Sequence, residues 1–315
     1  MLVTFSSCDN DLQVNADYKE TIVIFGLLDP NQPKQFIKIN KAFLTNEQSV
    51  AAVAQIEDSI YFSDLKAELI EEQTGRIIPL TAENIGNKKP GIFLAEPNYM
   101  YTTTEPIIAR NSYQIHVENL KTGLKADSRT EVVDNAVIFG PANAFDTDFT
   151  ISNTSTSVIG INLIAGNDAR LYDVILDFDY EEFNEFDTAN KTQKRITWKI
   201  MDSKSATDRS SIKSSLSTKL FFDLLTAQID VRKDWVRRAK GFQVTYIGGG
   251  EELGNYISVT RPSIGIVQKQ SEYTNIRNGL GIFSSRNVMI TRYLSPSPIT
   301  ISTLTTTPAT SALGF

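Results

Sequence analysis

Acidic side chains between residues 177 and 187 form the densest group in this sequence that could do chemistry. The group consists of Asp177, Asp179, Glu181, Glu182, Glu185 and Asp187. Carboxylates of this kind could bind calcium, or two of them could hydrolyse a glycosidic bond. The loop spacing and central glycine of an EF-hand are missing, and alternation with apolar residues fits one face of a strand. The run therefore gives a weak calcium candidate at Asp177, Asp179 and Glu181, and leaves a hydrolase using these side chains as an alternative.

The single histidine, His116, argues against several classes of enzyme. A Ser-His-Asp site would have to use it, yet alternation over residues 113–118 places it on the polar face of a strand. The sequence contains no Gly-x-Ser-x-Gly elbow and no Walker-type phosphate loop. One histidine and one cysteine exclude a zinc site built mainly on nitrogen and sulfur. We therefore expect a protein that is not an enzyme, with no catalytic residues, no bound metal and no cofactor.

The only cysteine, Cys8, lies in the most specific motif of the chain. It follows a short apolar run and two serines, and Asp9 comes directly after it. This arrangement resembles a bacterial lipoprotein signal, in which the cysteine is lipidated and becomes the mature N-terminus. The apolar stretch is shorter than the roughly 7–15 residues of a secretory signal. We expect a truncated signal over 1–8, a lipidated Cys8 that tethers the protein to a membrane, and a linker over 9–17.

Composition describes an ordinary globular protein. With 315 residues, 41% hydrophobic and 22% charged, the chain can form two domains with full cores. The net charge of −6 predicts no binding to nucleic acid. Basic residues between 232 and 240 interleave with Asp230 and Asp234, which favours a solvated face over a phosphate-binding patch. These basic residues are Arg232, Lys233, Arg237, Arg238 and Lys240.

Short alternating segments in the first half predict a mostly β fold. Glycine, proline and asparagine separate them at intervals typical of a sandwich. The expected strands cover 21–26, 35–44, 64–71, 77–80, 113–118 and 125–133. Thr45 and Gln48 resemble a capping box that opens a short helix over 49–55. We expect an immunoglobulin-like β-sandwich over residues 18–133.

The second half, residues 134–294, is predicted to form an antiparallel β-rich domain. Residues 170–186 and 192–201 read as a long hairpin whose turn lies at 187–190. Even-numbered residues from Tyr172 to Tyr180 should share the apolar face. The register that we expect pairs Asp177 with Lys199, Phe178 with Trp198 and Glu181 with Arg195.

The same domain is expected to carry one packed helix, over residues 208–229. Apolar residues recur there at helical spacing, and Asp208 is a suitable N-cap. Residues 241–247 and 255–260 read as a further hairpin, with Gly248 to Gly250 as its turn. Residues 295–315 are rich in serine, threonine and proline and are expected to be a flexible tail.

Three segments together resemble a known family. They are Ser7-Cys8-Asp9, the block from Asp58 to Gly75, and the block from Tyr273 to Phe283. The sequence is similar in these places to the Bacteroidota lipoproteins of domain of unknown function 4249. The resemblance implies an outer-membrane lipoprotein on the periplasmic or cell-surface side, with an immunoglobulin-like domain. It also implies a TonB-dependent outer-membrane receptor as a partner, and it brings no catalytic residues.

Three functions remain open at this point. The first is a non-catalytic binding or accessory protein of the cell envelope, beside such a receptor. The second is an independent nutrient-binding or glycan-binding lipoprotein, which needs a concave site with aromatic side chains such as Tyr99, Tyr101 or Trp235. The third is an envelope hydrolase using the carboxylates between 177 and 187.

Overall fold

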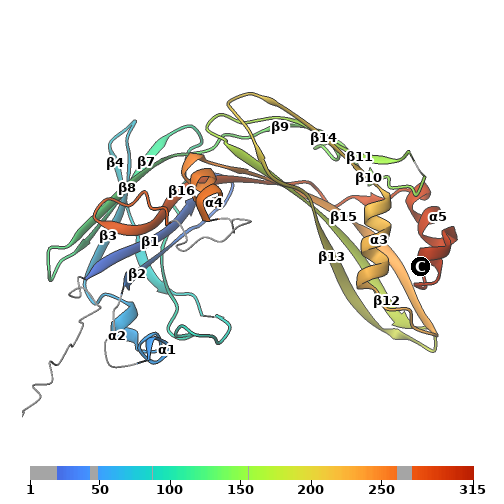
Figure 1. The fold of residues 1–315 in the computed structure, drawn as a ribbon, viewed down its shortest axis with the longest axis horizontal. Coiled ribbons are helices and arrows are strands. Elements are labelled where there is room, and N and C mark those ends of the chain that lie inside the picture. Colours follow the sequence, from blue (N-terminus) through green and yellow to red (C-terminus); the bar gives the residue numbers. More distant parts are fainter. Residues whose placement is uncertain (1–19, 43–48, 87, 155, 261–271) are drawn as a thin grey trace, which may run out of the picture.

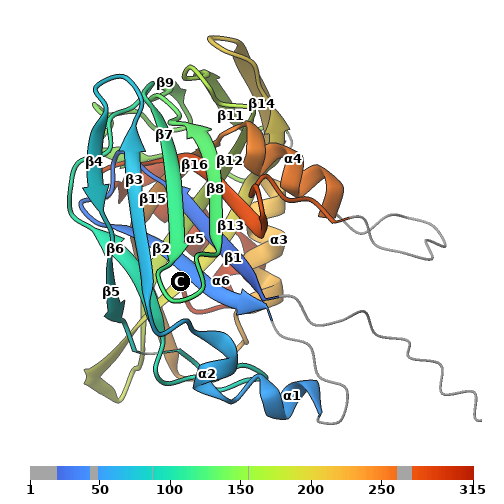
Figure 2. The same ribbon diagram turned by 90° about the vertical axis from the view of Figure 1, so that its left-hand side faces the viewer.

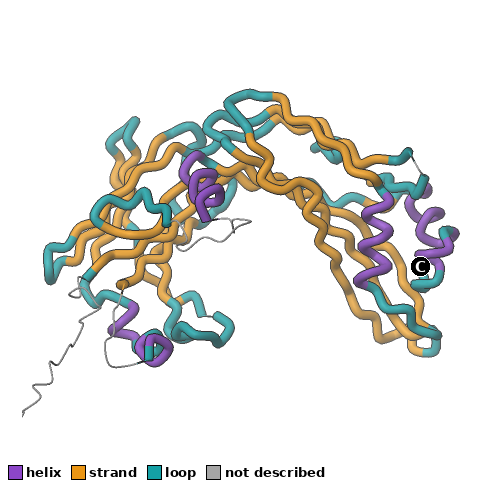
Figure 3. The backbone as a smooth tube through the Cα atoms, viewed as in Figure 1, coloured by secondary structure: helices purple, strands orange, loops and turns teal. Residues whose placement is uncertain are grey.

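The computed structural model describes residues 20–42, 49–86, 88–154, 156–260 and 272–315. The chain forms two lobes joined by long strands into a bent arch (Figure 1). Each lobe has its own hydrophobic core. The first core contains buried residues between Ile22 and Val132, together with Ile276 and Phe283, and the second contains buried residues between Val133 and Leu313. Strands dominate both lobes (Figure 3), so the prediction of a mostly β chain is confirmed.

The first lobe is a β-sandwich, as predicted. One layer consists of β16 (Gly279–Ile290), β1 (Thr21–Leu28), β2 (Gln35–Ala42), β6 (Tyr99–Thr103) and β5 (Thr81–Asn84), in that order. The facing layer consists of β4 (Arg76–Pro79), β3 (Leu65–Glu71), β7 (Ser112–Asn119) and β8 (Lys125–Glu131), in that order. Strand β16 comes from late in the chain and pairs in parallel with β1, which no local pattern predicted.

Alternation of side chains places the first core. On β7, Tyr113, Ile115 and Val117 are fully buried, while His116 on the opposite face is half-buried. The Nδ1 atom of His116 lies 2.6 Å from Oδ1 of Asp127 on β8, so the histidine is paired across the strands on the outer face. Two short helices, α1 (Val50–Val53) and α2 (Glu57–Ile60), close one end of the sandwich (Figure 2).

The second lobe extends the larger layer of the first. Strands β15 (Trp235–Gly249), β12 (Leu171–Asn184) and β13 (Asp187–Ser205) continue outward from β16, so one eight-stranded sheet spans both lobes. A three-stranded sheet contains β14 (Ser211–Ser217), β11 (Val158–Ile164) and β9 (Val137–Gly140). Strands β10 (Asp148–Phe149) and β17 (Ser295–Pro296) pair separately.

Three asparagines hold the two lobes together at the waist of the arch. The Nδ2 atom of Asn31, after β1, donates to Oδ1 of Asn135 at 3.2 Å and to Oδ1 of Asn287 at 3.1 Å. Asn287 on β16 in turn donates to the carbonyl oxygen of Val133 at 3.1 Å. These hydrogen bonds join the loop after β1 and strand β16 to residues 133–135, where the chain passes from the first core to the second.

The long hairpin of the second lobe is present, with the predicted faces. Even-numbered residues from Tyr172 to Tyr180 are buried, and the odd-numbered residues from Asp173 to Asp179 are half-buried on the other face. The predicted turn at 187–190 is wrong, because β12 ends at Asn184 and β13 begins at Asp187.

The predicted register of this hairpin is wrong by two positions. The observed partners are Thr197 for Asp177, Ile196 for Phe178 and Gln193 for Glu181. Register shifts between Tyr172 and Ile175 cause the difference, because they add extra residues to β13. A shift of two keeps every side chain on its face, which is why the burial pattern remained correct.

The predicted helix over 208–229 is wrong in its first half. Residues 211–217 form β14, and the helix α3 (Lys219–Gln228) begins later. A spacing of four residues, as between Ile212 and Leu216, fits the same face of a strand as well as a helix. The serines around them are weak helix formers, and pairing with β11 decides the outcome. Asp208 caps no helix; its Oδ1 accepts hydrogen bonds from Asp168 and Arg170.

The predicted hairpin around Gly248 to Gly250 is also wrong. Strand β15 continues through Gly249, and residues 251–260 form the helix α4 (Glu251–Thr260). The glycines permit a close approach instead of a turn, since a Cβ on Gly248 would lie 3.1 Å from the ring of Tyr172. Glu251 and Glu252 lie in the first turn of α4, where negative charge is favourable.

The predicted flexible tail is folded. Residues 298–311 form α5 (Pro298–Thr306) and α6 (Pro308–Ser311), so the second lobe has more than one packed helix. The Ser297 hydroxyl accepts the backbone N–H of Thr300, and Pro298 follows this cap, which starts α5. Leu304 and Leu313 are buried in the second core, which offsets the entropy cost of ordering the segment. Among the described residues, no helix has both the length and the apolar character of a membrane span.

Candidate ligand-binding pocket

A hollow with aromatic walls opens at one end of the first lobe. Its volume is about 370 Å³, within the roughly 300–1,000 Å³ of small-ligand sites. We call it the tyrosine pocket. Its walls are three tyrosines, one phenylalanine, two carboxylates and four smaller side chains. They are Tyr61, Tyr99, Tyr101, Phe62, Glu57, Asp58, Ile39, Ser63, Leu65 and Ala82.

The fold brings these residues together from three places. Tyr99 and Tyr101 are two positions apart on β6, so they lie on one face of the sheet. The backbone of Tyr101 pairs with that of Ile37 on β2 and with that of Ala82 on β5. Helix α2 is anchored by the buried Ile60 and delivers Tyr61 and Phe62 directly after its last residue.

The ring of Tyr61 is held in one orientation. Lys38 Nζ donates to the Tyr61 hydroxyl at 2.8 Å, and that hydroxyl donates to the carbonyl oxygen of Pro97 at 3.1 Å. The rings of Tyr61 and Tyr99 meet edge to face, with 5.1 Å between their centroids. Burial, with a smaller contribution from the charge of Lys88, lowers the pKa of Lys38 to about 8. The aromatic wall is therefore preorganised, and its supporting ammonium group titrates at mildly alkaline pH.

Tyr101 differs from Tyr61 in its hydrogen bonding. It is only 8% exposed, and burial raises the pKa of its hydroxyl. No other described residue forms a hydrogen bond with that hydroxyl, whereas the hydroxyl of buried Tyr113 donates to Glu71. A ligand that reached this hydroxyl would find a donor and an acceptor that no described residue occupies.

The chemistry of this pocket suits recognition. Aromatic faces pack against C–H groups, and exposed Glu57 and Asp58 can accept hydrogen bonds from hydroxyl or amine donors. Of the three aromatic residues predicted as ligand contacts, Tyr99 and Tyr101 meet here. Trp235 does not, because it starts β15 in the other lobe, where the guanidinium of Arg232 lies 5.1 Å from its ring. Cys8 lies outside the described residues.

The sequence did not single out Tyr61, Phe62 and Lys38 as site residues. Tyr61 and Phe62 lie in the block from Asp58 to Gly75, but no residue spacing connects that block to β6. Only the packing of α2 over the end of the sheet brings the three beside Tyr99.

Carboxylates of the acidic run on β12 are engaged in ion pairs with neighbouring strands. Arg195 forms two hydrogen bonds to Asp179, at 2.6 and 2.8 Å, and these bonds lower the pKa of that carboxyl. Asp177 accepts from the Thr197 hydroxyl at 2.6 Å, and Glu181 lies 3.4 Å from Lys191 Nζ. Across the described ranges, no three His, Cys, Asp or Glu side chains are arranged to hold a metal ion. The pairing favours a structural role for the run.

Only part of the basic cluster at 232–240 is exposed to solvent. Arg232, Lys233, Arg238 and Lys240 are exposed. Arg237 is 3% exposed, and its Nε donates to Glu182 Oε2 at 3.1 Å. The prediction of a solvated face is therefore wrong at Arg237, because strand alternation turns this residue inward.

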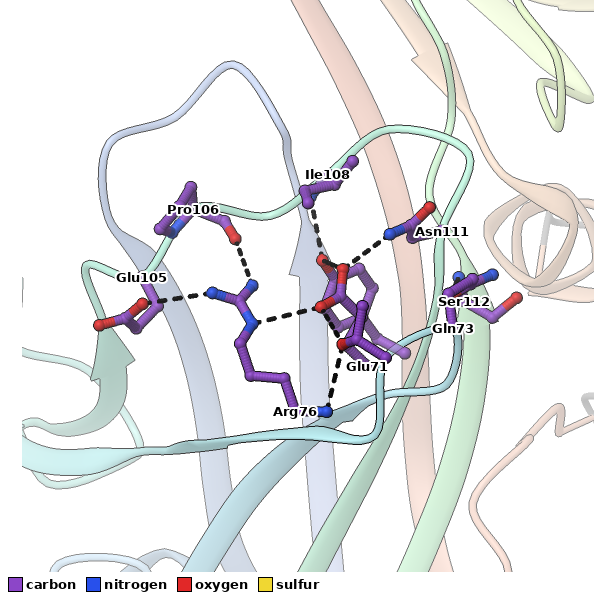
Figure 4. A network of polar contacts seen from close by, with 10 residues as sticks. Glu71, Gln73, Arg76, Glu105, Pro106, Ile108, Asn111 and Ser112 are labelled. Atoms are coloured by element: carbon purple, nitrogen blue, oxygen red, sulfur yellow. Dashed lines mark hydrogen bonds and ion pairs between the residues drawn. The ribbon is translucent and has the colours of Figure 1, made fainter.

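A second polar cluster surrounds Glu71 inside the first lobe (Figure 4). Glu71 is 1% exposed and accepts four hydrogen bonds. The donors are Thr74 at 2.7 Å, Asn111 at 2.7 Å, Arg76 at 3.2 Å and Tyr113 at 3.2 Å. One carboxylate at the β3–β4 turn accepts hydrogen bonds from all four donors. The network therefore stabilises the fold and does not form a reactive site.

A second hollow lies between the lobes and has a volume of about 270 Å³. Charged residues from β8, the loop before β12 and the start of α4 line it. Burial, and then the charge and hydrogen bond of Glu131, raise the pKa of Asp168 to about 6, while Arg170 opposes the shift. A carboxyl with a raised pKa binds protons more tightly in the folded state, so ionisation of Asp168 weakens the fold above about pH 6.

Replacing Asp168 by asparagine should therefore stabilise the protein at neutral pH. We expect a gain of about 1 kcal/mol at pH 7.5, reduced by solvent screening because the residue is half-exposed. Below about pH 4, where Asp168 is protonated in both states, the gain should vanish. Asparagine tolerates the positive φ of 63° at this position. Urea unfolding at several pH values measures the difference, and a gain independent of pH would contradict the assignment.

Comparisons with known proteins add little to this geometry. No family model matches the chain, and no curated protein is similar to it in sequence. The C-terminal globular domain of an oligosaccharyltransferase from Pyrococcus abyssi shares 10% identity, with a TM-score of 0.25 over 72% of this chain and 46% of that one. The FN1–FN3 domains of chicken CNTN1 share 10% identity, with a TM-score of 0.19 over 88% of this chain and 65% of that one. This chain thus matches less than two thirds of either structure, and such weak likenesses establish neither ligand nor activity.

Proposed function

We propose that this protein is a non-catalytic binding protein of the cell envelope, tethered by a lipid on Cys8. Its ligand is a small polyhydroxylated molecule of the sugar class, held in the tyrosine pocket. The lipid tether keeps the folded body of the protein beside an outer membrane. The ligand is bound and released unchanged.

The observation that carries this proposal is the preorganised aromatic wall beside two exposed carboxylates. A sugar ring has an apolar C–H face, which suits the rings of Tyr61 and Tyr99, and hydroxyls at its edge. Those hydroxyls can donate to Glu57 and Asp58 and can bond the unpartnered hydroxyl of Tyr101.

Replacing Tyr99 by alanine is expected to weaken sugar binding at least tenfold, because one face of the stacking wall is lost. Titration calorimetry and saturation-transfer NMR with a panel of neutral mono- and disaccharides would measure it. Tyr101→Phe should cost less, since only one hydroxyl is removed. Trp235→Ala is the matched control, because that aromatic residue lies in the other lobe. Failure of every sugar to bind, or equal loss in the control, would overturn the proposal.

The tether has a test of its own. Labelled palmitate in the native host should be incorporated into the protein made from its complete reading frame, and should be absent from the Cys8→Ala variant. An unmodified thiol at Cys8 in the wild-type protein would contradict the membrane tether. It would not contradict sugar binding in the tyrosine pocket.

A different observation favours a second candidate, the accessory role beside a TonB-dependent outer-membrane receptor. Phe186, at the tip of the β12–β13 hairpin, and Phe145, between β9 and β10, are each more than four-fifths exposed. Exposed aromatic side chains are typical of protein contact sites. If the protein co-purifies with an outer-membrane β-barrel, and Phe186→Ser reduces the amount that co-purifies, the accessory role is supported. If the protein is absent from such a preparation, the role is contradicted.

A further inference from the structure

Apolar side chains gather on the surface next to the tyrosine pocket. Ile92 and Phe93 are 66% and 53% exposed at the tip of the segment between β5 and β6, and Val50 and Ile56 beside them are also exposed. The backbone N–H of Leu94 donates to the Ala54 carbonyl at 2.9 Å, which holds the segment against α1. Gln55 Nε2 donates to the carbonyls of Gly91 and Ile92 at 2.9 and 2.7 Å. We call Val50, Ile56, Ile92 and Phe93 the apolar tip.

Two lysines border the apolar tip. Lys88 Nζ lies 5.8 Å from the centroid of the Phe93 ring and donates to the carbonyl of Leu94 at 2.8 Å. Lys89 is exposed two residues before Gly91. Apolar side chains flanked by lysines match the boundary of a bilayer, where rings and aliphatic groups enter the acyl region and ammonium groups reach phosphates.

The apolar tip lies at the end of the lobe where the N-terminal segment enters the fold. Thr21 at the start of β1 pairs with Ala42 at the end of β2, and Glu20 lies 3.4 Å from Lys41. Helices α1 and α2 close this same end (Figure 2). Cys8 precedes Glu20 by twelve residues, which span at most about 40 Å when fully extended. A lipid on Cys8 is therefore close enough to bring this end onto the membrane.

We propose that the apolar tip inserts into the surface of the bilayer to which the protein is tethered. The inference rests on the proposed tether for its setting, and it assigns an orientation to the body. With the tip in the membrane, the tyrosine pocket lies beside the lipid surface. A second copy of the chain is the competing occupant of the same surface.

The sole cysteine allows a test that does not depend on lipidation in the host. The chain of residues 1–315, with Cys8 as a free thiol, is coupled to a maleimide phospholipid in vesicles of phosphatidylethanolamine and phosphatidylglycerol. A Phe93→Trp variant should then show blue-shifted emission and at least twofold quenching by brominated lipids, beyond the signal of the native Trp198 and Trp235. Phe145→Trp, in the second lobe, should show neither change, although Phe145 is more exposed than Phe93, at 89% against 53%.

Two further measurements make the outcome decisive. Adding Lys89→Glu to the Phe93→Trp protein should reduce the quenching on anionic vesicles, because an attraction to phosphate becomes a repulsion. Equal quenching of the Phe93→Trp and Phe145→Trp variants, or no quenching of Phe93→Trp, would overturn the proposed membrane insertion of the apolar tip. This holds even if palmitate labels Cys8 in the host. Sedimentation of the uncoupled protein as a dimer that Ile92→Ser dissociates would assign the surface to a second copy and would also overturn it.

Discussion

Replacing Glu71 by glutamine is expected to lower the free energy of unfolding by about 2–4 kcal/mol. Oε1 of Glu71 accepts from Asn111 and Tyr113, and Oε2 accepts from Thr74 and Arg76. A glutamine amide must turn its NH₂ group toward one of these two pairs of donors. Either orientation opposes donor to donor at a buried site and removes the buried carboxylate from Arg76, which keeps only the carboxylate of Glu105, at 3.4 Å.

The same network predicts how the difference depends on pH. Hydrogen bonds from Thr74, Asn111 and Tyr113, with the charge of Arg76, outweigh burial and lower the pKa of Glu71. A lowered carboxyl pKa stabilises the fold above the unfolded-state pKa, and this stability is lost as pH falls through the folded-state value. The gap between wild type and Glu71→Gln should therefore narrow below about pH 4.5.

Glu72 provides the matched control at the adjacent position. It points to the outer face, where it pairs with the exposed Arg129 at 2.9 Å. Surface ion pairs contribute about 0–1 kcal/mol, so Glu72→Gln should change stability little. Urea unfolding of both variants, followed by circular dichroism, measures the contrast. Equal effects at 71 and 72 would show that the buried network does not hold the first lobe together.

Local patterns predicted the first lobe well because its strands obey a period of two. Residues 64–71 and 113–118 alternate, and they became β3 and β7 with the expected faces buried. Strand β16 was expected in the second domain, residues 134–294, and not in this lobe. Its parallel partner β1 lies about 250 residues away in sequence, and only tertiary packing selects such a pairing.

Errors in the second lobe share a physical origin. Residues 211–217, 255–260 and 298–311 all have weak intrinsic preferences for the helix, because they contain serines, threonines and β-branched residues. In such segments the neighbours decide the structure. Strand β11 recruits 211–217 into a sheet, while the second core buries Leu304 and Leu313 and so folds a segment that composition alone described as loose.

The candidate pocket was half predictable. Tyr99 and Tyr101 were suspected as aromatic side chains for a concave site, although no strand was predicted at 99–103. Tyr61 and Phe62 could not be placed beside them, because α2 packs over the sheet through contacts that no spacing encodes. Trp235 was suspected for its residue type alone, and the fold places it in the other lobe.

Replacing Arg237 by leucine is expected to cost about 3–5 kcal/mol of stability in the second lobe. Arg237 Nε donates to Glu182 at 3.1 Å, and its Nη1 donates to the carbonyl of Leu313. Its backbone N–H also donates to the Gly314 carbonyl at 2.7 Å, which docks the end of the chain on β15. Leucine would leave the buried Glu182 carboxylate with only the longer ion pairs to the exposed Lys194 at 3.6 Å and Arg232 at 3.9 Å, and the Leu313 carbonyl without its donor.

Arg238→Leu is the control for this prediction, because it removes the same charge one residue later. The Arg238 guanidinium is exposed and lies 5.1 Å from the ring of Phe183, a contact worth about 0.5–1 kcal/mol. A Glu182→Leu/Arg237→Leu double variant should recover part of the loss, since no buried charge then remains. Urea unfolding measures stability, and hydrogen exchange over residues 308–315 measures docking. Unchanged protection in Arg237→Leu would show that the hydrophobic contacts of Leu304 and Leu313 hold the C-terminal helices without the buried ion pair.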